Sequence, residues 1–412
     1  MLLKNGKPSF ILIIIALIIC GVVVFCIWPL FPSVANNKVE YNTNDNVLKD
    51  KSEVKGEVSP INMTANAGDQ KNEASVLPVT HIKTPDKVRA LYMSGWVAGS
   101  KNFRDSVIKI VDKTEINAVV IDIKDSTGRV SFQIDDPLIK EIGSAENRIR
   151  NIRELTALLH SKNIYIIGRI STFQDPYLTK LKPAWAVKKL SDGGTWKDRK
   201  GLSFLDPTNK NVHEYVLTLA ERSYEEGFDE INLDYIRYPS DGNIKDINYN
   251  LAQGKTRADN MESFFKYFYT EIKKYGDVPI SGDVFGLTTE ASDDMGIGQV
   301  WEKALPYFDF LCPMVYPSHY PSGHSGYKNP ALYPYEVINK ALASASVKSK
   351  EINQNITKNR PWLQDFDMGA TYTKEMIRAE IKAVYDNGLD SWMMWDPSNK
   401  YTSSAFLLET KN

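Results

Sequence analysis

The feature that most constrains the fold is an alternation of short apolar segments with longer amphipathic segments, which begins near residue 88. Eight apolar segments have the length and composition of strands, at residues 90–94, 118–123, 165–170, 230–234, 279–283, 310–315, 361–364 and 391–395. Amphipathic helices are predicted between them, at 104–114, 149–161, 211–226, 258–274, 295–304, 335–345 and 374–387. Eight strand–helix units over about 320 residues predict a (β/α)8 TIM barrel, an α/β fold, over residues 88–412.

The chain before the barrel has a different composition. Residues 10–28 are apolar, and no charged residue lies between Lys7 and Lys38. A helix of this length, at about 1.5 Å per residue, nearly spans a hydrocarbon layer of about 30 Å. Lys4 and Lys7 precede the run, which places the N-terminus in the cytoplasm. We expect a short cytoplasmic segment at 1–9 and a transmembrane signal-anchor at 10–30.

A cleaved signal peptide is the alternative interpretation of this run. Ser33, Val34 and Ala35 resemble a small-x-small cleavage site, although the run exceeds the usual h-region of about 7–15 residues. Residues 31–87 are predicted to be a flexible linker, because 36–87 are rich in polar and charged residues, with Tyr41 as the sole aromatic. In both interpretations the barrel lies outside the cytoplasm, on a single-pass membrane anchor or as a secreted protein.

Composition excludes several classes of function. The 412 residues carry 50 Lys and Arg against 51 Asp and Glu, so bulk charge gives no attraction to nucleic acid. Of three cysteines, Cys20 and Cys26 lie in the apolar run and Cys312 is alone in the barrel, which excludes a disulfide framework and a cysteine zinc site. The Gly296-Ile297-Gly298 stretch lacks the third glycine of a dinucleotide fingerprint, and we expect no cofactor.

Carboxylates and aromatic residues follow the predicted strands. In a barrel the carboxyl ends of all strands open on one face, where active sites are built. Cleavage of a glycosidic bond needs two carboxyl groups, and aromatic faces stack on sugar rings. We predict Asp234 and Asp283 as catalytic residues, with ten residues binding substrate: Trp96, Asp122, Asp125, Tyr235, Arg237, Tyr316, His319, Trp362, Asp365 and Trp395.

Alternative roles stay open for several of these residues. Aspartate at the end of a strand is often the N-cap of the next helix, which applies to Asp122, Asp125 and Asp396. Glu290 and Asp365 compete with Asp283 as the proton donor. His319 and its neighbour His324 lack an obvious carboxylate that would complete a metal site, so we expect no metal. The open alternatives thus concern helix-capping aspartates, the identity of the proton donor, and the two histidines.

The chain resembles a bacterial family of glycoside-hydrolase barrels within the TIM-barrel glycosidase superfamily, a domain of largely unassigned function. The residues that carry the resemblance are 90–96, 120–125, 194–201, 205–207 and 227–239, the last reading Gly-Phe-Asp-Glu-Ile-Asn-Leu-Asp-Tyr-Ile-Arg-Tyr-Pro. It implies a secreted or membrane-anchored carbohydrate-active protein, with Asp234 matching the acid of the fourth strand. Amylase-like relatives carry Glu on the fifth strand, where this chain has Asp283.

Two functions of different classes follow. The first is a membrane-tethered glycoside hydrolase that acts outside the cytoplasm on a polysaccharide, such as one of the cell envelope. The second is a catalytically inactive barrel that binds polysaccharide or serves as a scaffold at the cell surface. A metal-dependent hydrolase such as a deacetylase requires a His/Asp triad that the spacing does not supply.

Overall fold

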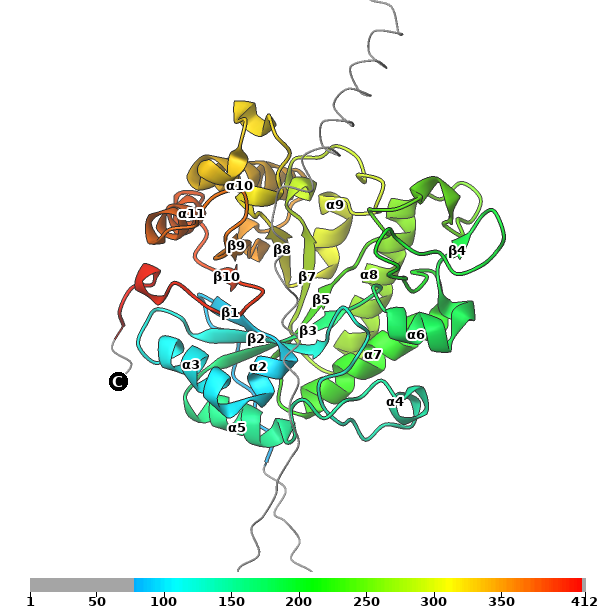
Figure 1. Ribbon diagram of the computed structural model, residues 1–412, viewed down its shortest axis with the longest axis horizontal. Helices are drawn as coiled ribbons and strands as arrows, with labels where there is room; N and C mark the ends of the chain where they lie inside the picture. The colour runs from blue at the N-terminus through cyan, green and yellow to red at the C-terminus, as the bar shows by residue number, and fades with distance from the viewer. Residues whose placement is uncertain (1–77, 410–412) are drawn as a thin grey trace, which may run out of the picture. The chain divides into compact units, whose positions relative to one another are not determined.

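The predicted apolar segments form eight parallel strands that close into a barrel, in the order β1-β10-β9-β8-β7-β5-β3-β2 (Figure 1). The computed structural model describes residues 78–409. The barrel strands are β1 Arg89–Met93, β2 Ala118–Lys124, β3 Tyr165–Ser171, β5 Glu230–Asp234, β7 Ile280–Phe285, β8 Phe310–Met314, β9 Trp362–Gln364 and β10 Trp392–Trp395. The predicted barrel is confirmed. The predicted membrane anchor and most of the predicted linker lie outside the described residues.

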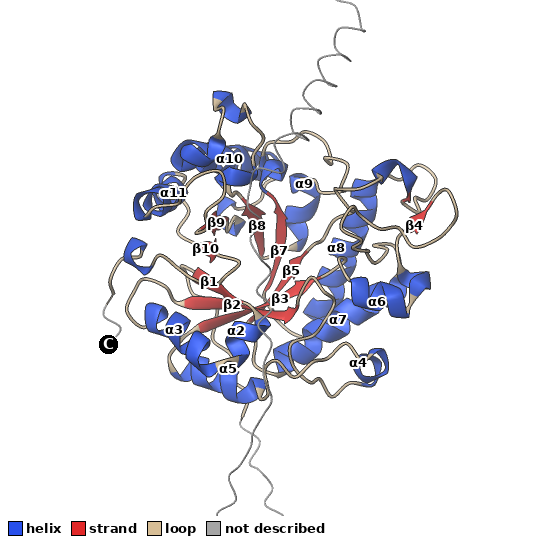
Figure 2. Cartoon of the chain, in the orientation of Figure 1, coloured by secondary structure: helices blue, strands red, loops and turns tan. Residues whose placement is uncertain are grey.

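Helices surround the strands, as Figure 2 shows in blue around red. They are α2 Gly95–Gly99, α3 Lys101–Val111, α4 Pro137–Ile142, α5 Ile152–Ser161, α6 Pro176–Leu181, α7 Lys210–Glu225, α8 Arg257–Tyr275, α9 Trp301–Ala304, α10 Pro334–Glu351 and α11 Lys374–Asp386. Two short strands, β4 Lys188–Lys189 and β6 Ile247–Asn248, pair antiparallel and join the loops after β3 and β5. Within residues 78–409, none of the helices combines the length and apolar character needed to cross a bilayer.

The helix predicted at 295–304 is wrong over most of its length, because only Trp301–Ala304 is α-helical. Met295, Gly296 and Gly298 have φ of 49°, 74° and 82°, in the left-handed region that cannot continue a helix. The Asp294 carboxylate accepts the backbone N–H of Gly296 at 3.0 Å and fixes this turn. Apolar spacing therefore suggested a helix where local side-chain bonding and glycine favour a loop.

Inward-facing residues alternate along the strands and fill the barrel. The lower interior contains Tyr165, Glu230 and Arg360, all fully buried, with Arg360 Nη1 2.8 Å from Glu230 Oε1. The chain before β1 closes this end. The Ile82 backbone N–H donates to Asp229 Oδ1 at 2.7 Å, and the Thr84 and Tyr165 hydroxyls are 2.9 Å apart. The start of the described chain thus packs against the N-terminal ends of the strands.

An extended tail takes the position of an eighth barrel helix. Among the described residues, only the single 3-10 turn Ser403–Ala405 follows β10. The tail is held to the chain that follows α3: the Glu115 backbone N–H donates to the Leu407 carbonyl at 2.8 Å, and the Leu407 N–H donates to Glu115 Oε1 at 3.0 Å. The Phe406 ring stacks on Trp392 with centroids 6.1 Å apart, so the outward face of β10 is covered without a helix.

Candidate active site

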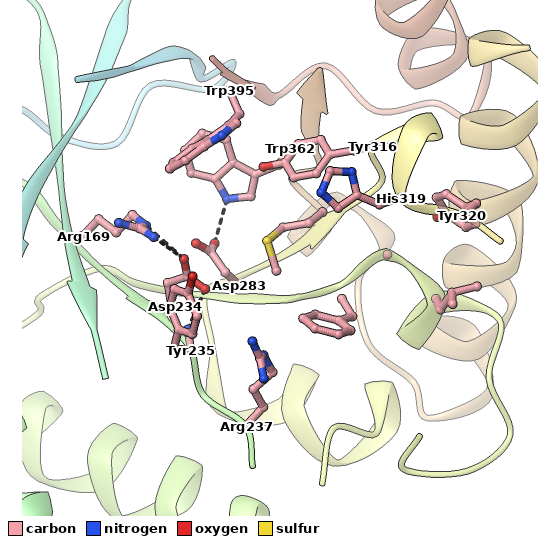
Figure 3. A pocket seen from close by; sticks show the side chains of 14 residues that line it. Arg169, Asp234, Tyr235, Arg237, Asp283, Tyr316, His319, Tyr320, Trp362 and Trp395 are labelled. Atoms are coloured by element: carbon pink, nitrogen blue, oxygen red, sulfur yellow. Dashed lines mark hydrogen bonds and ion pairs between the residues drawn. The ribbon is translucent and has the colours of Figure 1, made fainter. Parts of the chain in front are cut away.

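A pocket of about 400 Å³ opens at the carboxyl ends of the barrel strands (Figure 3). Polar and aromatic side chains from β3, β5, β7, β8, β9 and β10 and their loops converge on it. It is lined by Arg169, Asp234, Tyr235, Arg237, Asp283, Phe285, Gly286, Leu287, Met314, Tyr316, His319, Tyr320, Trp362 and Trp395. A concave site with many apolar walls and few convergent polar groups is typical of a ligand site.

Asp234 ends β5 and is held as a hydrogen-bonded carboxylate. Arg169 Nε donates to its Oδ2 at 3.0 Å, and the Tyr235 backbone N–H donates to its Oδ1 at 2.5 Å. Tyr235 has φ of 52°, an unfavourable conformation for a bulky residue that is enriched at functional sites. Asp234 therefore has its negative charge compensated by a buried guanidinium.

Asp283 lies on β7 in a contrasting environment, with a side chain that is buried. Its Oδ1 accepts hydrogen bonds from Asn232 Nδ2 at 2.9 Å and from Trp362 Nε1 at 2.8 Å, both neutral donors. Burial raises the pKa of the Asp283 carboxyl well above its ordinary value, and the negative charge of Asp234 raises it further. Of the two acids, Asp283 is thus the one whose surroundings favour the protonated form.

Strand register explains why the two acids meet. Leu233 of β5 pairs with Gly282 of β7, and Asp234 and Asp283 are the next residues on these neighbouring parallel strands. One level lower, Asn232 pairs with Ser281, and the Asn232 side chain donates to both Ser281 Oγ and Asp283 Oδ1. Figure 3 shows both carboxyl groups facing the same space.

Arg169 connects Asp234 to a second buried acid, Asp122. Arg169 Nη1 donates to Asp122 Oδ1 at 2.6 Å, and the Tyr92 hydroxyl donates to Asp122 Oδ2 at 2.6 Å. Burial raises the pKa of Asp122, whereas the Arg169 charge opposes this shift. Asp122 does not line the pocket. It acts behind Arg169, by fixing the guanidinium that contacts Asp234.

Aromatic rings form the wall beside the acids. Trp362 and Trp395 meet edge to face with centroids 5.7 Å apart, and Tyr92 stacks behind Trp395 at 4.0 Å. Tyr316 and His319 continue this wall from the loop after β8. Burial lowers the pKa of His319, so its imidazole is the neutral form near neutral pH. The wall therefore offers ring faces and neutral hydrogen-bonding groups.

This combination of paired acids and rings can be compared with known proteins. The chain matches, over residues 90–401, the model of the family described as "Putative glycosyl hydrolase domain". The chain belongs to this family. The match covers nearly the whole barrel, and the description of the family agrees with the glycoside-hydrolase resemblance seen in the sequence.

The solved structure of a glycoside hydrolase domain agrees with the barrel fold of this family member. The glycoside hydrolase domain of PgaB (BpsB) from Bordetella bronchiseptica is 11% identical, with a TM-score of 0.58 over 79% of this chain and 100% of that one. A hypothetical protein from Ruminiclostridium thermocellum is 34% identical over 50% of this chain and 98% of its own, with a TM-score of 0.43. No curated protein sequence matches the chain.

Besides Asp122, three predicted substrate-binding residues lie outside the pocket. Trp96 is 64% exposed on α2, where Arg148 stacks on it at 4.9 Å. Asp125 accepts the Thr127 N–H at 2.9 Å and pairs with Arg148 at 2.6 Å. Asp125 therefore helps to fix the loop after β2 through Arg148, and Trp96 packs against the same arginine.

Asp365 is the third of these residues. Its two carboxylate oxygens accept the backbone N–H and the hydroxyl of Thr402, each at 2.8 Å, so it fastens the tail. Glu290, the other alternative proton donor, pairs with Lys340 at 2.7 Å and lies 3.3 Å from His324. Neither acid lines the pocket. Asp396, as its alternative role suggested, caps a turn through the Ser398 N–H at 2.7 Å.

Sequence reasoning did not assign a site role to Arg169, although a signal was present. Arg169 is the only charged residue in the otherwise apolar strand 165–170, at an inward position of the alternation. Phe285 and Met314 at the ends of β7 and β8, and Leu287 and Tyr320 in the loops that follow, were also missed, because isolated residues of these types give no comparable signal. Within residues 78–409, no three His, Cys, Asp or Glu side chains are grouped so that they could hold a metal ion.

Proposed function

We propose that the protein hydrolyses a glycosidic bond of a polysaccharide outside the cytoplasm, with Asp283 as the general acid and Asp234 as the nucleophile or base. The observation that carries the proposal is the pair of carboxyls with opposite environments in one pocket. Asp283 is buried among neutral donors with a raised pKa, and Asp234 is charge-compensated by Arg169. Such divergence is the pattern by which glycosidases separate acid from nucleophile.

The chemistry follows from these roles. Asp283 donates its proton to the leaving oxygen as the glycosidic bond breaks, and Asp234 attacks the sugar carbon or activates a water molecule. Arg169 and the Tyr235 N–H hold the Asp234 carboxylate in place. The partly exposed ring of Trp395 offers a stacking surface for a sugar, whereas Trp362 is buried and holds Asp283 through its Nε1. Two acids in one pocket support hydrolysis over the alternative of an inactive polysaccharide-binding or scaffolding barrel.

The proposed location rests on the sequence of the first 87 residues. The apolar run at 10–28 after Lys4 and Lys7 supports a single-pass membrane anchor, and the polar linker would let the barrel reach polysaccharide of the cell envelope. The pocket is a site of suitable size for part of one chain of such a polymer.

The test is a screen of the full chain in detergent against envelope polysaccharides, with new reducing ends as the readout. Wild type is expected to cleave at least one polymer. Asp283→Asn should lower the rate by about 10²- to 10⁴-fold, the range for loss of a general acid, and Asp234→Asn should be similarly impaired. Asp365→Asn is the matched control and should retain activity.

Two outcomes would contradict the proposal. Full activity of either pocket variant on the cleaved polymer would remove that residue from catalysis. Binding of a polymer without cleavage by wild type would instead support the inactive barrel. Circular dichroism of each variant separates loss of chemistry from loss of fold.

A further inference from the structure

Arg237 is the cation of the pocket that has no carboxylate partner. Its Nη1 donates to the Tyr238 carbonyl at 3.1 Å and to Ser240 Oγ at 3.3 Å. Within residues 78–409, it takes part in no ion pair at 4.0 Å or less. The other arginine of the pocket, Arg169, is paired with both Asp122 and Asp234. Arg237 therefore has no acidic partner among the described residues, whereas Arg169 has two.

The free edge of the Arg237 guanidinium has the geometry for a carboxylate. Nε and Nη2 have no hydrogen-bond partner among the described residues. These two nitrogens lie on one edge of the planar group, which can form two parallel N–H···O bonds. Arg257 uses the same edge for Asp294, at 2.9 and 3.0 Å. The Arg257–Asp294 pair thus shows, in the same chain, the two-bond contact with a carboxylate that the free edge of Arg237 has the geometry to form.

Aromatic rings hold Arg237 in position. Its guanidinium carbon lies 4.6 Å from the Phe285 ring centroid and 5.2 Å from that of Tyr235. Figure 3 shows the guanidinium extending into the space that Asp234 and Asp283 face. The hydrogen bonds to Tyr238 and Ser240 use only Nη1 of Arg237. A structural role in holding this turn therefore does not account for Nε and Nη2.

The charges around Arg237 leave a place for an anion. Asp234 and Asp198 contribute nearby negative charge, but neither is within ion-pair distance, and Asp234 is already paired with Arg169. Partial removal of a guanidinium from water is costly unless a counter-charge is supplied. The bound ligand is the remaining source of that charge.

We propose that Arg237 binds a carboxylate of the substrate, and that the pocket accepts a sugar bearing an acid group, such as a uronic acid. This inference rests on the proposed function of the pocket, whose substrate class it specifies. The ring faces would contact the sugar, and the Arg237 edge would distinguish a carboxylate from the hydroxymethyl group of a neutral sugar.

The experiment measures binding rather than turnover. The full chain is titrated at neutral pH with two matched pairs, D-glucuronate against D-glucose and D-galacturonate against D-galactose, using tryptophan fluorescence, since Trp362 and Trp395 line the pocket. Wild type should bind at least one uronate about tenfold or more tightly than its neutral partner, as expected for a charge-assisted hydrogen bond. In Arg237→Gln the preference should fall to within about twofold.

The matched control is Arg199→Gln, which removes the same charge from an exposed arginine paired with Asp241 outside the pocket; it should keep the wild-type preference. Equal binding of uronates and neutral sugars by wild type, or a preference that survives in Arg237→Gln, would overturn the inference. If Arg237→Gln does not fold, the wild-type comparison decides, and Arg237→Lys should show a reduced preference.

The two proposals fail separately. If Asp283→Asn hydrolyses polymer normally while wild type prefers uronates, the catalytic assignment fails and the carboxylate site stands. If Asp283→Asn is inactive while wild type shows no preference for uronates, the catalytic assignment stands and the carboxylate site fails.

Discussion

At the scale of single residues, the pocket contains two aspartates in different environments, because only one of them contacts a guanidinium group. Asp234 has Arg169 against its carboxylate, whereas Asp283 has only the neutral donors Asn232 and Trp362. The asymmetry arises because Arg169 reaches Asp122 and Asp234 from β3, on the far side of β5 from Asp283. The proposed acid and base roles therefore depend on strand order as much as on residue type.

This environment predicts how activity depends on pH. Because burial raises the pKa of Asp283 and the reaction needs its protonated form, kcat/KM should remain high above the pH at which an ordinary aspartate ionises. It should then fall as pH rises through the Asp283 pKa. A pH profile of kcat/KM on the cleaved polymer checks this. A profile that rises across the same range would identify Asp283 as a base instead.

Asp365 supplies a prediction on stability. Burial raises its pKa from 3.8 to about 6. The folded state thus binds a proton more tightly than the unfolded state, so its contribution is fully present below the unfolded pKa and is lost as pH rises through about 6. Relative to Asp365→Asn, the unfolding free energy of wild type should fall by about 3 kcal/mol between the two pKa values.

Urea unfolding of both proteins at a series of pH values measures this difference. Above the Asp365 pKa the acid is ionised in both the folded and the unfolded state. The unfolding free energies of wild type and Asp365→Asn should therefore change with pH in parallel there. A constant difference across the range would show that Asp365 ionises normally in the folded protein.

At the scale of elements, the strands could be predicted from sequence more reliably than the helices. Barrel strands are buried on both faces and read as short apolar runs rich in β-branched residues, so their positions follow from composition. The short helices α4 and α6 were missed because each has only six residues, too few to show a period. The segment before α9 was mispredicted because a glycine turn preserved apolar spacing.

The candidate site shows the same limit. Strand-end position predicted that Asp234, Asp283, Trp362 and Trp395 come together, and the structure places all four in the pocket. The same criterion also selected Trp96, Asp122, Asp125 and Asp365, which do not line the pocket. A position at a strand end shows only that the backbone of the residue is near the mouth of the barrel. The path of the following loop decides where the side chain points. That path depends on contacts between residues distant in sequence, such as Asp365 with Thr402.

The tail that replaces an eighth helix gives a prediction at this scale. Phe406 is 4% exposed and covers Trp392, so Phe406→Ala should lower the unfolding free energy by about 3–5 kcal/mol. Leu408→Ala, two residues away on the same tail but 86% exposed, is the matched control and should change it by less than about 0.5 kcal/mol. Denaturant unfolding distinguishes them. Equal effects of the two substitutions on the unfolding free energy would mean that the packing of Phe406 on Trp392 does not stabilise the barrel.

At the scale of the whole molecule, the proposed anchor can be tested in cells that make the protein. The barrel should be in the membrane fraction of wild type and should be degraded by protease added to intact cells, because we place it outside the cytoplasm. Deletion of residues 1–35 should abolish both results. Release of the wild-type barrel into the medium, with an N-terminus near Ala35, would instead support the cleaved signal peptide.

The contacts of residues 80–84 have a consequence for how polymers reach the protein. Thr80, Ile82 and Thr84 bind His160, Asp229 and Tyr165, all at the ends where strands begin, whereas the pocket lies where strands finish. The described chain therefore enters the barrel on the side remote from the mouth. Residues 78–84 leave the approach to the mouth sterically free, and long chains can cross the mouth without displacing this segment.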